Sequence, residues 1–382
     1  MDNRLLGGIS PAQFMRRHWQ KSPRLIRQAL PRFEGILDRK ALFVLAARDD
    51  VEARLVIREG SAKSSWTLAH GPFRASDFRS LPATNWTLLV QGVDLHVDAA
   101  AALLQRFAFI PFARLDDLMI SYAVPGGGVG PHFDSYDVFL LQGPGRRRWR
   151  VSTQDDLRLQ RGLPLKILAH FRPEQSWDLE PGDMLYLPPS VAHDGVALTE
   201  CMTYSIGFRA PTARELAEAF LQFLPESLQL PDKRYADPEL RPTKTPGSID
   251  PAMVRRLSAT LAAVRWDRST IARFTGCMLS EPKSGVFFER PDPALSMRGF
   301  VRTLRRNAGI ARLDRRARML YDRADVFFNG ERFAALAEHP ALAALADRRQ
   351  LAVDDALPES TLRLLHQAYL NGALHVGESA ES

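Results

Sequence analysis

Cysteine is nearly absent from this chain. Cys201 and Cys277 are the only two among 382 residues, which excludes the disulfide framework of a small secreted scaffold. Long apolar runs are missing as well, since none approaches the ~20 residues that cross a bilayer. Residues 1–8 are too short and too polar for the apolar region of a signal peptide. We therefore expect a cytoplasmic protein with no membrane partner.

Blocks of like charge are also absent. The chain has 51 Lys and Arg against 44 Asp and Glu, a net charge of +7, and no basic run of the kind that marks a nucleic-acid-binding tail. Over residues 301–382, twelve basic residues oppose eleven acidic ones. A basic chain suits work near ribosomal RNA or basic protein complexes. Because no concentrated phosphate-binding footprint is present, however, the sequence predicts no strong direct nucleic-acid binding.

The most informative feature that is present is His132-Phe133-Asp134, followed 61 residues later by His193. Two histidines and one carboxylate form the facial triad that holds non-haem Fe(II) in oxygenases. Alternate residues of a strand share one face, so His132 and Asp134 can reach one metal while Phe133 packs away from it. A His-x-Asp pair alone is equally compatible with a surface pair. The glycine-rich segment 126–130 and the Pro-Pro-Ser-Val-Ala-His context of His193 favour the metal site.

Short apolar runs separated by turn residues fill the chain from 118 to 209, a pattern typical of a barrel or sandwich. Eight strands are predicted, in an order that fits a double-stranded β-helix, a jelly-roll relative with a cavity at one mouth. The second strand carries the first two ligands and the seventh carries His193, and these strands are neighbours in that topology. The predicted strands are 118–124, 130–134, 136–142, 146–152, 176–180, 183–187, 191–197 and 201–209.

The fourth predicted strand places Arg147, Trp149 and Val151 on one face and three further arginines on the other. If Trp149 and Val151 point inward, so does Arg147, and a buried guanidinium is costly unless it is paired. No acidic residue on the neighbouring strands is an obvious partner. A ligand carboxylate, such as the distal one of 2-oxoglutarate, would supply the pair. The alternative is a solvated arginine cluster with Trp149 as the only core residue.

Two serines are candidates for hydroxyl donors beside the same co-substrate. Ser121 lies on the first predicted strand and Ser205 on the eighth. Either can equally fill space in a tapering barrel, so the sequence leaves both roles open.

Six segments, spread over nearly the whole chain, carry a family resemblance. They are the His-Phe-Asp…His triad, the runs at 126–132, 136–139 and 145–151, the opening 14–27, and the hairpin around 325–331. Together they resemble the bacterial JmjC-domain ribosomal oxygenases of the cupin-4 group. The resemblance implies an α+β protein whose JmjC/cupin jelly roll is followed by a helical dimerisation segment and a winged-helix-like domain.

The resemblance also implies chemistry. Members of the group depend on Fe(II) and on 2-oxoglutarate as co-substrate; His132, Asp134 and His193 match their metal ligands, and Arg147 matches their distal-carboxylate anchor. The bacterial branch hydroxylates an arginine of large-subunit ribosomal protein sixteen, whereas eukaryotic relatives hydroxylate histidines of other ribosomal proteins. Those relatives tend to have lysine where Arg147 stands, so the arginine favours the arginyl-hydroxylase branch.

The substrate is the least determined part of the prediction. An arginyl side chain would find carboxylates at the barrel mouth, for which Asp137 and Asp194 are candidates, although each can simply be a surface residue. Histidyl hydroxylation or demethylation of another protein fits the same triad, because no motif identifies the substrate. The remaining alternative is a non-catalytic cupin binding module, against which the intact triad and Arg147 argue.

At 382 residues the chain exceeds the usual single domain. We expect a catalytic domain at 1–209, a helical dimerisation segment at 210–289 and a winged-helix-like domain at 290–382, the last in the order helix, helix, hairpin, helix. Apolar stripes to spare on helices 212–224, 251–266 and 268–279 predict a homodimer, in agreement with the resemblance. Before the barrel, the predicted helices are 11–19 and 97–107, and the predicted strands are 42–45, 53–57, 65–68 and 86–91.

Overall fold

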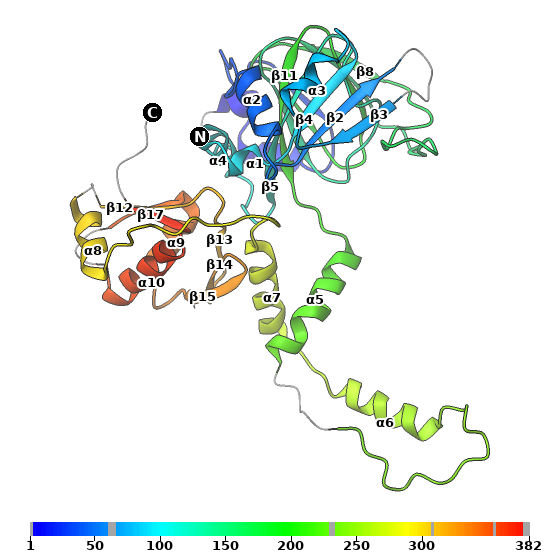
Figure 1. Cartoon of the computed structure of the whole chain (residues 1–382), viewed down its shortest axis with the longest axis vertical. Coiled ribbons are helices and arrows are strands. Elements are labelled where there is room, and N and C mark those ends of the chain that lie inside the picture. Colours follow the sequence, from blue (N-terminus) through cyan, green and yellow to red (C-terminus); the bar gives the residue numbers. More distant parts are fainter. Residues whose placement is uncertain (1–2, 60–65, 229–233, 307–308, 354–356, 377–382) are drawn as a thin grey trace. The chain divides into compact units, whose positions relative to one another are not determined.

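The computed structural model describes residues 3–59, 66–228, 234–306, 309–353 and 357–376. The chain divides into two compact units, Met1–Ala210 and Pro211–Ser382 (Figure 1). Within the described ranges, no helix combines the length and the apolar character needed to cross a membrane.

Two antiparallel sheets form the first unit. The larger has eight strands in the order β1-β9-β6-β11-β5-β4-β2-β3, and the smaller has the order β10-β7-β8. The strands are β1 (Arg24–Ile26), β2 (Ala53–Arg58), β3 (Trp66–His70), β4 (Trp86–Val90), β5 (Leu115–Ala123), β6 (Val138–Gln142), β7 (Arg147–Ser152), β8 (Gln175–Leu179), β9 (Met184–Leu187), β10 (Ala192–Ala197) and β11 (Cys201–Phe208).

Seven of the eight strands predicted between 118 and 209 are present, and one prediction is wrong. The segment 130–134 forms no ladder; it makes only an isolated antiparallel bridge between His132 and His193. Gly130 has φ +79°, and a Cβ there would lie 3.0 Å from the Trp66 ring. Pro131 lacks the N–H that a ladder needs. A left-handed glycine followed by proline therefore replaces the strand by one extended bridge.

Helices cover the larger sheet, and one of them replaces a predicted strand. The prediction of a strand at 42–45 is wrong, because those residues lie in α2 (Arg39–Ala46). Asp38 accepts a hydrogen bond of 2.7 Å from the backbone N–H of Ala41, which caps the helix. A short apolar run does not distinguish helix from strand, and the cap decides here. The other helical elements are η1 (Asn3–Leu6), α1 (Pro11–Arg17), α3 (Ala75–Arg79), η2 (Val93–Leu95) and α4 (Asp98–Gln105).

Strands β6 and β9 separate two apolar cores by their alternating faces. Phe139 and Tyr186 point to the core beneath the helices, where Phe14 packs edge-on against Tyr186 at a ring distance of 4.9 Å. The opposite faces contribute to a second core, inside the barrel between the two sheets. Its buried members are Val138, Leu140, Trp149, Val151, Leu179, Leu185, Leu187 and Val191. Register therefore assigns every second residue of β5, β6, β7 and β11 to the barrel interior.

The second unit begins with three helices, α5 (Ala213–Ser227), α6 (Pro251–Ala262) and α7 (Arg268–Ser280). Two three-stranded sheets follow, β16-β12-β17 and β13-β14-β15, with a core of their own. Only one helix, not the predicted two, precedes the hairpin in the described part. The elements are α8 (Met297–Arg306), β12 (Ile310–Leu313), β13 (Met319–Tyr321), β14 (Asp325–Phe328), β15 (Glu331–Ala335), α9 (Ala341–Arg348), β16 (Gln350–Ala352), α10 (Glu359–Leu370) and β17 (Leu374–Val376).

Candidate metal centre and co-substrate pocket

Two backbone hydrogen bonds bring the predicted metal ligands together. The N–H of His132 donates to the carbonyl of His193 at 2.9 Å, and the N–H of His193 donates back at 2.8 Å. A third bond, from the N–H of Ser190 to the carbonyl of Asp134 at 2.7 Å, holds the carboxylate-bearing residue next to them. His132 and His193, which are 61 positions apart in sequence, are thus paired in a single antiparallel bridge.

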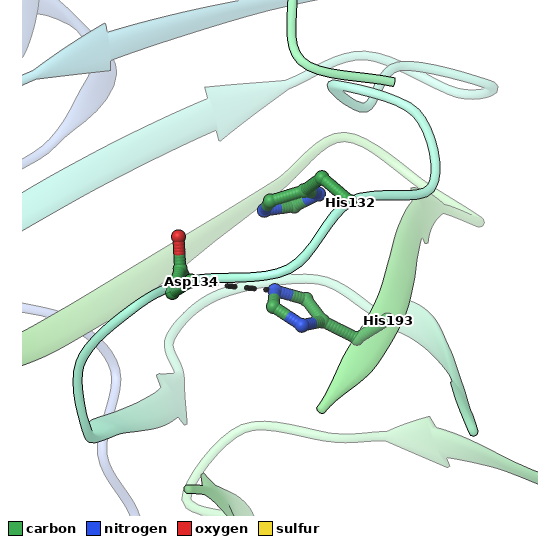
Figure 2. Close-up of side chains that lie close together, drawn as sticks. All are labelled: His132, Asp134 and His193. Atoms are coloured by element: carbon green, nitrogen blue, oxygen red, sulfur yellow. Dashed lines mark ion pairs between the residues drawn. The ribbon is translucent and has the colours of Figure 1, made fainter. Parts of the chain in front are cut away.

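The three side chains converge on one point, as Figure 2 shows. One ligand atom from each of His132, Asp134 and His193 lies within 4.8 Å of the others. The imidazole centroids are 4.2 Å apart, and Nε2 of His193 is 3.6 Å from an Asp134 oxygen. Two imidazoles and one carboxylate at this spacing match the donor set of a non-haem Fe(II) site and occupy only three ligand positions.

Hydrogen bonds orient both imidazole rings for metal binding. Nδ1 of His132 is 2.9 Å from the carbonyl of Gly130, and Nδ1 of His193 is 2.9 Å from the carbonyl of Val191. A carbonyl only accepts, so each Nδ1 carries the proton and each Nε2 keeps its lone pair. Such carbonyl partners fix the tautomer of metal-binding histidines.

Burial keeps His193 in the form that a metal requires. Its side chain is almost fully enclosed, and burial lowers the pKa of His193, as does the neighbouring His132, against the opposing effect of Asp134. The neutral imidazole is therefore favoured near neutral pH, and only the neutral ring coordinates a cation.

The predicted inward face of β7 is confirmed. Arg147 is 4% exposed, and Trp149 and Val151 are buried beside it. The Nη1 of Arg147 donates to Ser121 Oγ at 3.3 Å, and the guanidinium lies 5.7 Å from the centre of the Trp149 ring. Its Nε and Nη2 are buried without any hydrogen-bond partner, as is the indole Nε1 of Trp149. No carboxylate of the described residues pairs with this guanidinium.

The unpartnered N–H donors of Arg147 indicate which kind of ligand suits this part of the barrel. A buried cation without a counter-charge costs several kcal/mol, so the site is incomplete without an anion. A carboxylate would accept from the free N–H groups and supply the missing negative charge. The residues present therefore fit an anionic co-substrate that reaches this end of the barrel.

Both predicted serines line the same interior. Ser121 on β5 lies opposite Thr203 of β11, and Ser205 on β11 lies opposite Leu140 of β6, whose side chain belongs to the barrel core. Both serines are buried. Ser121 already contacts Arg147, which makes it the better placed of the two beside the orphaned guanidinium.

Asp137 does not lie at an open mouth, which corrects the prediction from the sequence, whereas Asp194 lines a cavity of about 310 Å³ together with Gly130 and Pro131. Asp137 is completely buried and accepts from the Tyr186 hydroxyl at 2.6 Å and from Gln20 at 3.0 Å. Asp194 is also buried and pairs with Arg150 on the neighbouring strand. Both carboxylates are committed to contacts within the chain, so the structure gives no support to a role in substrate binding.

Tyr136 is a site neighbour that the sequence reasoning did not select. It follows Asp134 by two residues, and 39% of its surface is exposed. Burial of the hydroxyl raises the pKa of Tyr136, and the negative charges of Asp134 and Asp117 add to the rise. An exposed aromatic ring close to Asp134 suits a cationic side chain. The same-face spacing from Asp134 was the available sequence signal.

Comparisons with known proteins agree with this geometry. A family model described as JmjC domain matches residues 102–216, and a ROXA-like winged helix model matches 263–375. The ribosomal protein uL16 3-hydroxylase of Escherichia coli K12 is 35% identical over 364 residues, which cover 94% of this chain and 95% of that protein. A probable ribosomal oxygenase of Haemophilus influenzae is 38% identical over 223 residues, covering 55% and 52% of the two chains.

A solved structure extends the similarity to three dimensions. The ribosomal oxygenase YcfD from Escherichia coli, in complex with cobalt and 2-oxoglutarate, superposes with a TM-score of 0.80 at 34% identity and covers 96% of this chain and 98% of that one. Both the sequence match and the structural match extend over nearly the entire length. The chain belongs to the JmjC-domain ribosomal oxygenases.

Proposed function

We propose that this chain is an Fe(II)- and 2-oxoglutarate-dependent hydroxylase that acts on an arginine of the large-subunit ribosomal protein uL16. The observation that carries the proposal is the pairing of two features in one barrel. The first feature is the set of metal-binding side chains formed by His132, Asp134 and His193. The second is the buried guanidinium of Arg147, two of whose nitrogen atoms have no hydrogen-bond partner. The uL16 3-hydroxylase similar to this chain over 94% of its length supports the substrate.

In this proposal the two histidines and Asp134 hold the iron. Neutral imidazoles and one carboxylate leave Fe(II) with a net charge of +1, so an anionic chelator is attracted to the remaining positions. The carbonyls of Gly130 and Val191 keep both Nε2 atoms aimed at the metal. When bound, Fe(II) and 2-oxoglutarate supply the activation of O2, with succinate, CO2 and a hydroxylated carbon as the products.

Arg147 anchors the far end of the co-substrate. On the paired strands β7 and β10, His193 lies opposite Val151 and Arg147 lies opposite Ala197. The two functional residues are thus four positions apart along the strands, ~13 Å at the usual rise. A short dicarboxylate that contacts the side chains at both ends would span this separation. Ser121 holds the guanidinium in place through its contact with Nη1.

The apolar barrel interior excludes water from this space. Leu140, Leu185 and Val151 are buried around it, so charged contacts there are stronger than in solvent. A substrate arginine approaches from the side of Tyr136, whose exposed ring receives a guanidinium. Positioning and water exclusion are the contributions of the protein to the reaction.

A peptide assay tests the proposal directly. Overlapping peptides that cover uL16 are incubated with the enzyme, Fe(II) and 2-oxoglutarate, and mass spectrometry reads the gain of one oxygen atom. We expect the gain on one arginine, with one succinate formed per oxygen, and no gain on the same peptide with lysine in that position. An oxygen placed on a histidine would overturn the arginine assignment. Absence of 2-oxoglutarate turnover with every peptide would overturn the oxygenase assignment.

We further propose that the chain is a homodimer. The α6 helix has no buried residue, yet Met253, Val254, Leu257 and Leu261 are exposed by 37–72% and fall on one stripe of the helix. Leu221 of α5 is exposed by 63%. An apolar stripe of this size in water is unfavourable and marks a surface that another chain covers.

The proposed domain division remains a catalytic domain at 1–209, a helical dimerisation segment at 210–289 and a winged-helix-like domain at 290–382. The JmjC match at 102–216 and the winged-helix match at 263–375 support the outer two. Because α7 contacts β13, β14 and β15, the helical segment and the winged-helix part share one compact unit. A ribosomal-protein substrate places the enzyme in the cytoplasm.

A further inference from the structure

An arginine-lined groove lies in the second unit, between α8 and the start of α10. It has a volume of about 650 Å³. Four arginines of α8 form its rim, and the floor is apolar. The lining residues are Met297, Arg298, Val301, Arg302, Arg305, Arg306, Leu357, Glu359 and Leu362. Figure 1 shows α8 and α10 in the same unit.

The rim is a regular row of positive charge. Arg298, Arg302 and Arg306 are four residues apart on α8 and are exposed; at 1.5 Å per residue they stand ~6 Å from one another along the axis. Phe300 and Leu304 of the same helix are buried, which turns the arginine face outward. Arg305 also lines the groove but has another interaction, so the row of available charge consists of the other three arginines.

This row costs the helix stability. Like charges four residues apart on a helix repel each other. Arg298 is moreover in the first turn of α8, where the helix dipole favours an acid and none is present. The one acidic residue that lines the groove, Glu359, is already paired with Arg363 at 2.6 Å. Among the described residues, nothing neutralises the row, so it is suited to an external polyanion.

We propose that this arginine groove binds the phosphate backbone of single-stranded RNA. Arginine matches phosphate oxygens with paired N–H donors, and a straight row over ~12 Å suits a chain that carries one charge per nucleotide. The choice of RNA over DNA rests on the proposed function, because a ribosomal-protein substrate is found beside RNA. No aromatic or amide side chain lines the groove, so neither base stacking nor base-edge reading is available there. Binding is therefore independent of base sequence.

The near-neutral charge of residues 301–382 predicted no strong nucleic-acid binding. That expectation averaged the charge over the segment. The fold instead gathers Arg302 and Arg306 with Arg298 on one helix face, and an electrostatic footprint depends on local charge rather than on the total.

Fluorescence anisotropy with the full chain and a labelled single-stranded RNA tests the proposal. Replacement of three arginines, R298Q/R302Q/R306Q, removes about three phosphate contacts. We expect the affinity at ~0.15 M salt to fall on the order of 10- to 50-fold and the slope of log K against log salt to shrink by about 2. Two RNAs of different base composition are expected to bind alike.

A matched variant removes the same charge elsewhere. R290Q/R323Q/R348Q changes three exposed arginines of the same unit that do not line the groove, and we expect it to bind RNA within about threefold of the parent chain. Peptide hydroxylation is expected to be unchanged in both variants, which separates RNA binding from the catalytic proposal. If the triple variant does not fold, R302Q alone is expected to reduce the salt slope by about 0.7.

Three outcomes would overturn the proposal. The first is a parent chain that does not bind RNA. The second is an equal loss of binding in the groove variant and in the matched variant. The third is displacement of RNA by polyglutamate of equal charge as effectively as by unlabelled RNA, which would identify the groove as a site for acidic peptides.

Discussion

At the scale of residues, one hydrogen bond from each imidazole to a backbone carbonyl fixes which ring nitrogen of each triad histidine can bind a metal. The ring orientations of His132 and His193 depend on the carbonyls of Gly130 and Val191, each two residues before its histidine. The same local geometry thus occurs at both ligands, although one lies on a loop and the other on β10. A histidine whose Nδ1 donates to a nearby carbonyl is pre-organised for a metal, because its Nε2 needs no rearrangement.

Loss of a triad ligand is the first prediction. His132→Ala or Asp134→Ala is expected to abolish 2-oxoglutarate turnover while thermal unfolding of the protein persists, because only a metal donor is removed. Calorimetry with Co(II) should show binding by the parent chain and none by either variant. His170→Ala changes an exposed histidine that contacts Asp156 and is not a member of the triad, and it serves as the control, with full turnover. Full succinate production by His132→Ala would remove the assignment of this residue as a ligand.

The second prediction concerns the orphaned guanidinium. Arg147→Met keeps much of the side-chain volume but removes the charge, and the loss of a buried charged pair is worth ~3–5 kcal/mol. We expect the dissociation constant for 2-oxoglutarate to rise by about two to four powers of ten. Without co-substrate, the variant should unfold at the same or a higher temperature, since an unpaired buried cation has been removed.

The exposed arginine directly before the same strand provides the control for this variant. Arg146→Met changes an exposed arginine directly before β7 and should leave 2-oxoglutarate binding unchanged, as measured by calorimetry. Equal affinities of the Arg147→Met variant and the parent chain would place the anchor elsewhere.

Asp314 gives the third prediction, a pH dependence in the second unit. Burial alone would raise the pKa of Asp314, but hydrogen bonds from His375 and Arg316 outweigh burial and hold the pKa below its usual value. A carboxylate with a depressed pKa stabilises the fold above its ordinary pKa of about 3.9, and this stabilisation is lost as the pH falls below that value. The free energy of unfolding should therefore decrease steadily below about pH 4.

Replacement of the carboxylate checks the cause. Asp314→Asn is expected to destabilise the unit by roughly 2–3 kcal/mol at pH 7, because it removes the buried carboxylate that accepts hydrogen bonds from Arg316 and His375. In urea unfolding, the difference between the variant and the parent chain should shrink as the pH falls below about 4. A constant difference over that range would show that the charge of Asp314 is not the source of the stability.

Element-scale effects are clearest in the strands that meet at the barrel. The inward face of β7 was predictable because alternation alone assigns Arg147, Trp149 and Val151 to one side. The strand predicted at 130–134 was not realised, because Gly130 and Pro131 prevent a ladder. A single bridge nevertheless aligns the two histidines, and the hydrogen bond from Ser190 to Asp134 holds the third residue of the triad.

The exposed stripe of α6 gives the fourth prediction. Leu257→Asp/Leu261→Asp introduces two charges into the apolar face, and burying them against a partner costs ~3 kcal/mol or more. The dimer dissociation constant should rise at least about 100-fold. Light scattering is expected to change from about twice the chain mass of 42.8 kDa to the mass of one chain.

The opposite face of α6 offers a matched control. Ala259→Asp/Ala262→Asp adds the same two charges about half a turn away from the stripe and should leave the dimer intact. A parent chain that scatters as a monomer at micromolar concentration would contradict the dimer itself. Dissociation by both variants would show that charge on the helix, and not its apolar face, matters.

For the whole molecule, the enclosed site restricts the form of the substrate. His193 and Arg147 are buried within the barrel, and His132 and Asp134 are partly buried, so the substrate arginine must enter as a flexible segment. The fifth prediction follows: isolated uL16 from a strain that lacks this enzyme gains one oxygen atom when treated with it, and the assembled large subunit gains far less. Mass spectrometry of the two preparations provides the measurement. Equal modification of both would contradict the need for a flexible segment.

Sequence alone determined the chemistry-bearing residues of the candidate site. His132, Asp134, His193 and Arg147 were identified because ligand type, spacing and strand alternation are local properties. Burial of the predicted carboxylates was not accessible in the same way. Asp137 is enclosed through Gln20 and Tyr186, which are 117 and 49 residues away in sequence, and no local pattern reports such partners.

Only the folded structure shows that the arginines of α8 line a groove formed with the start of α10. The sequence total over 301–382 is close to neutral, yet the helical repeat of α8 places Arg298, Arg302 and Arg306 in one exposed row beside a groove. It also decided that two donors of Arg147 lack partners, since that depends on every strand around the barrel. The physical reason is common to both: pattern specifies which way a side chain points, and only packing specifies what it meets there.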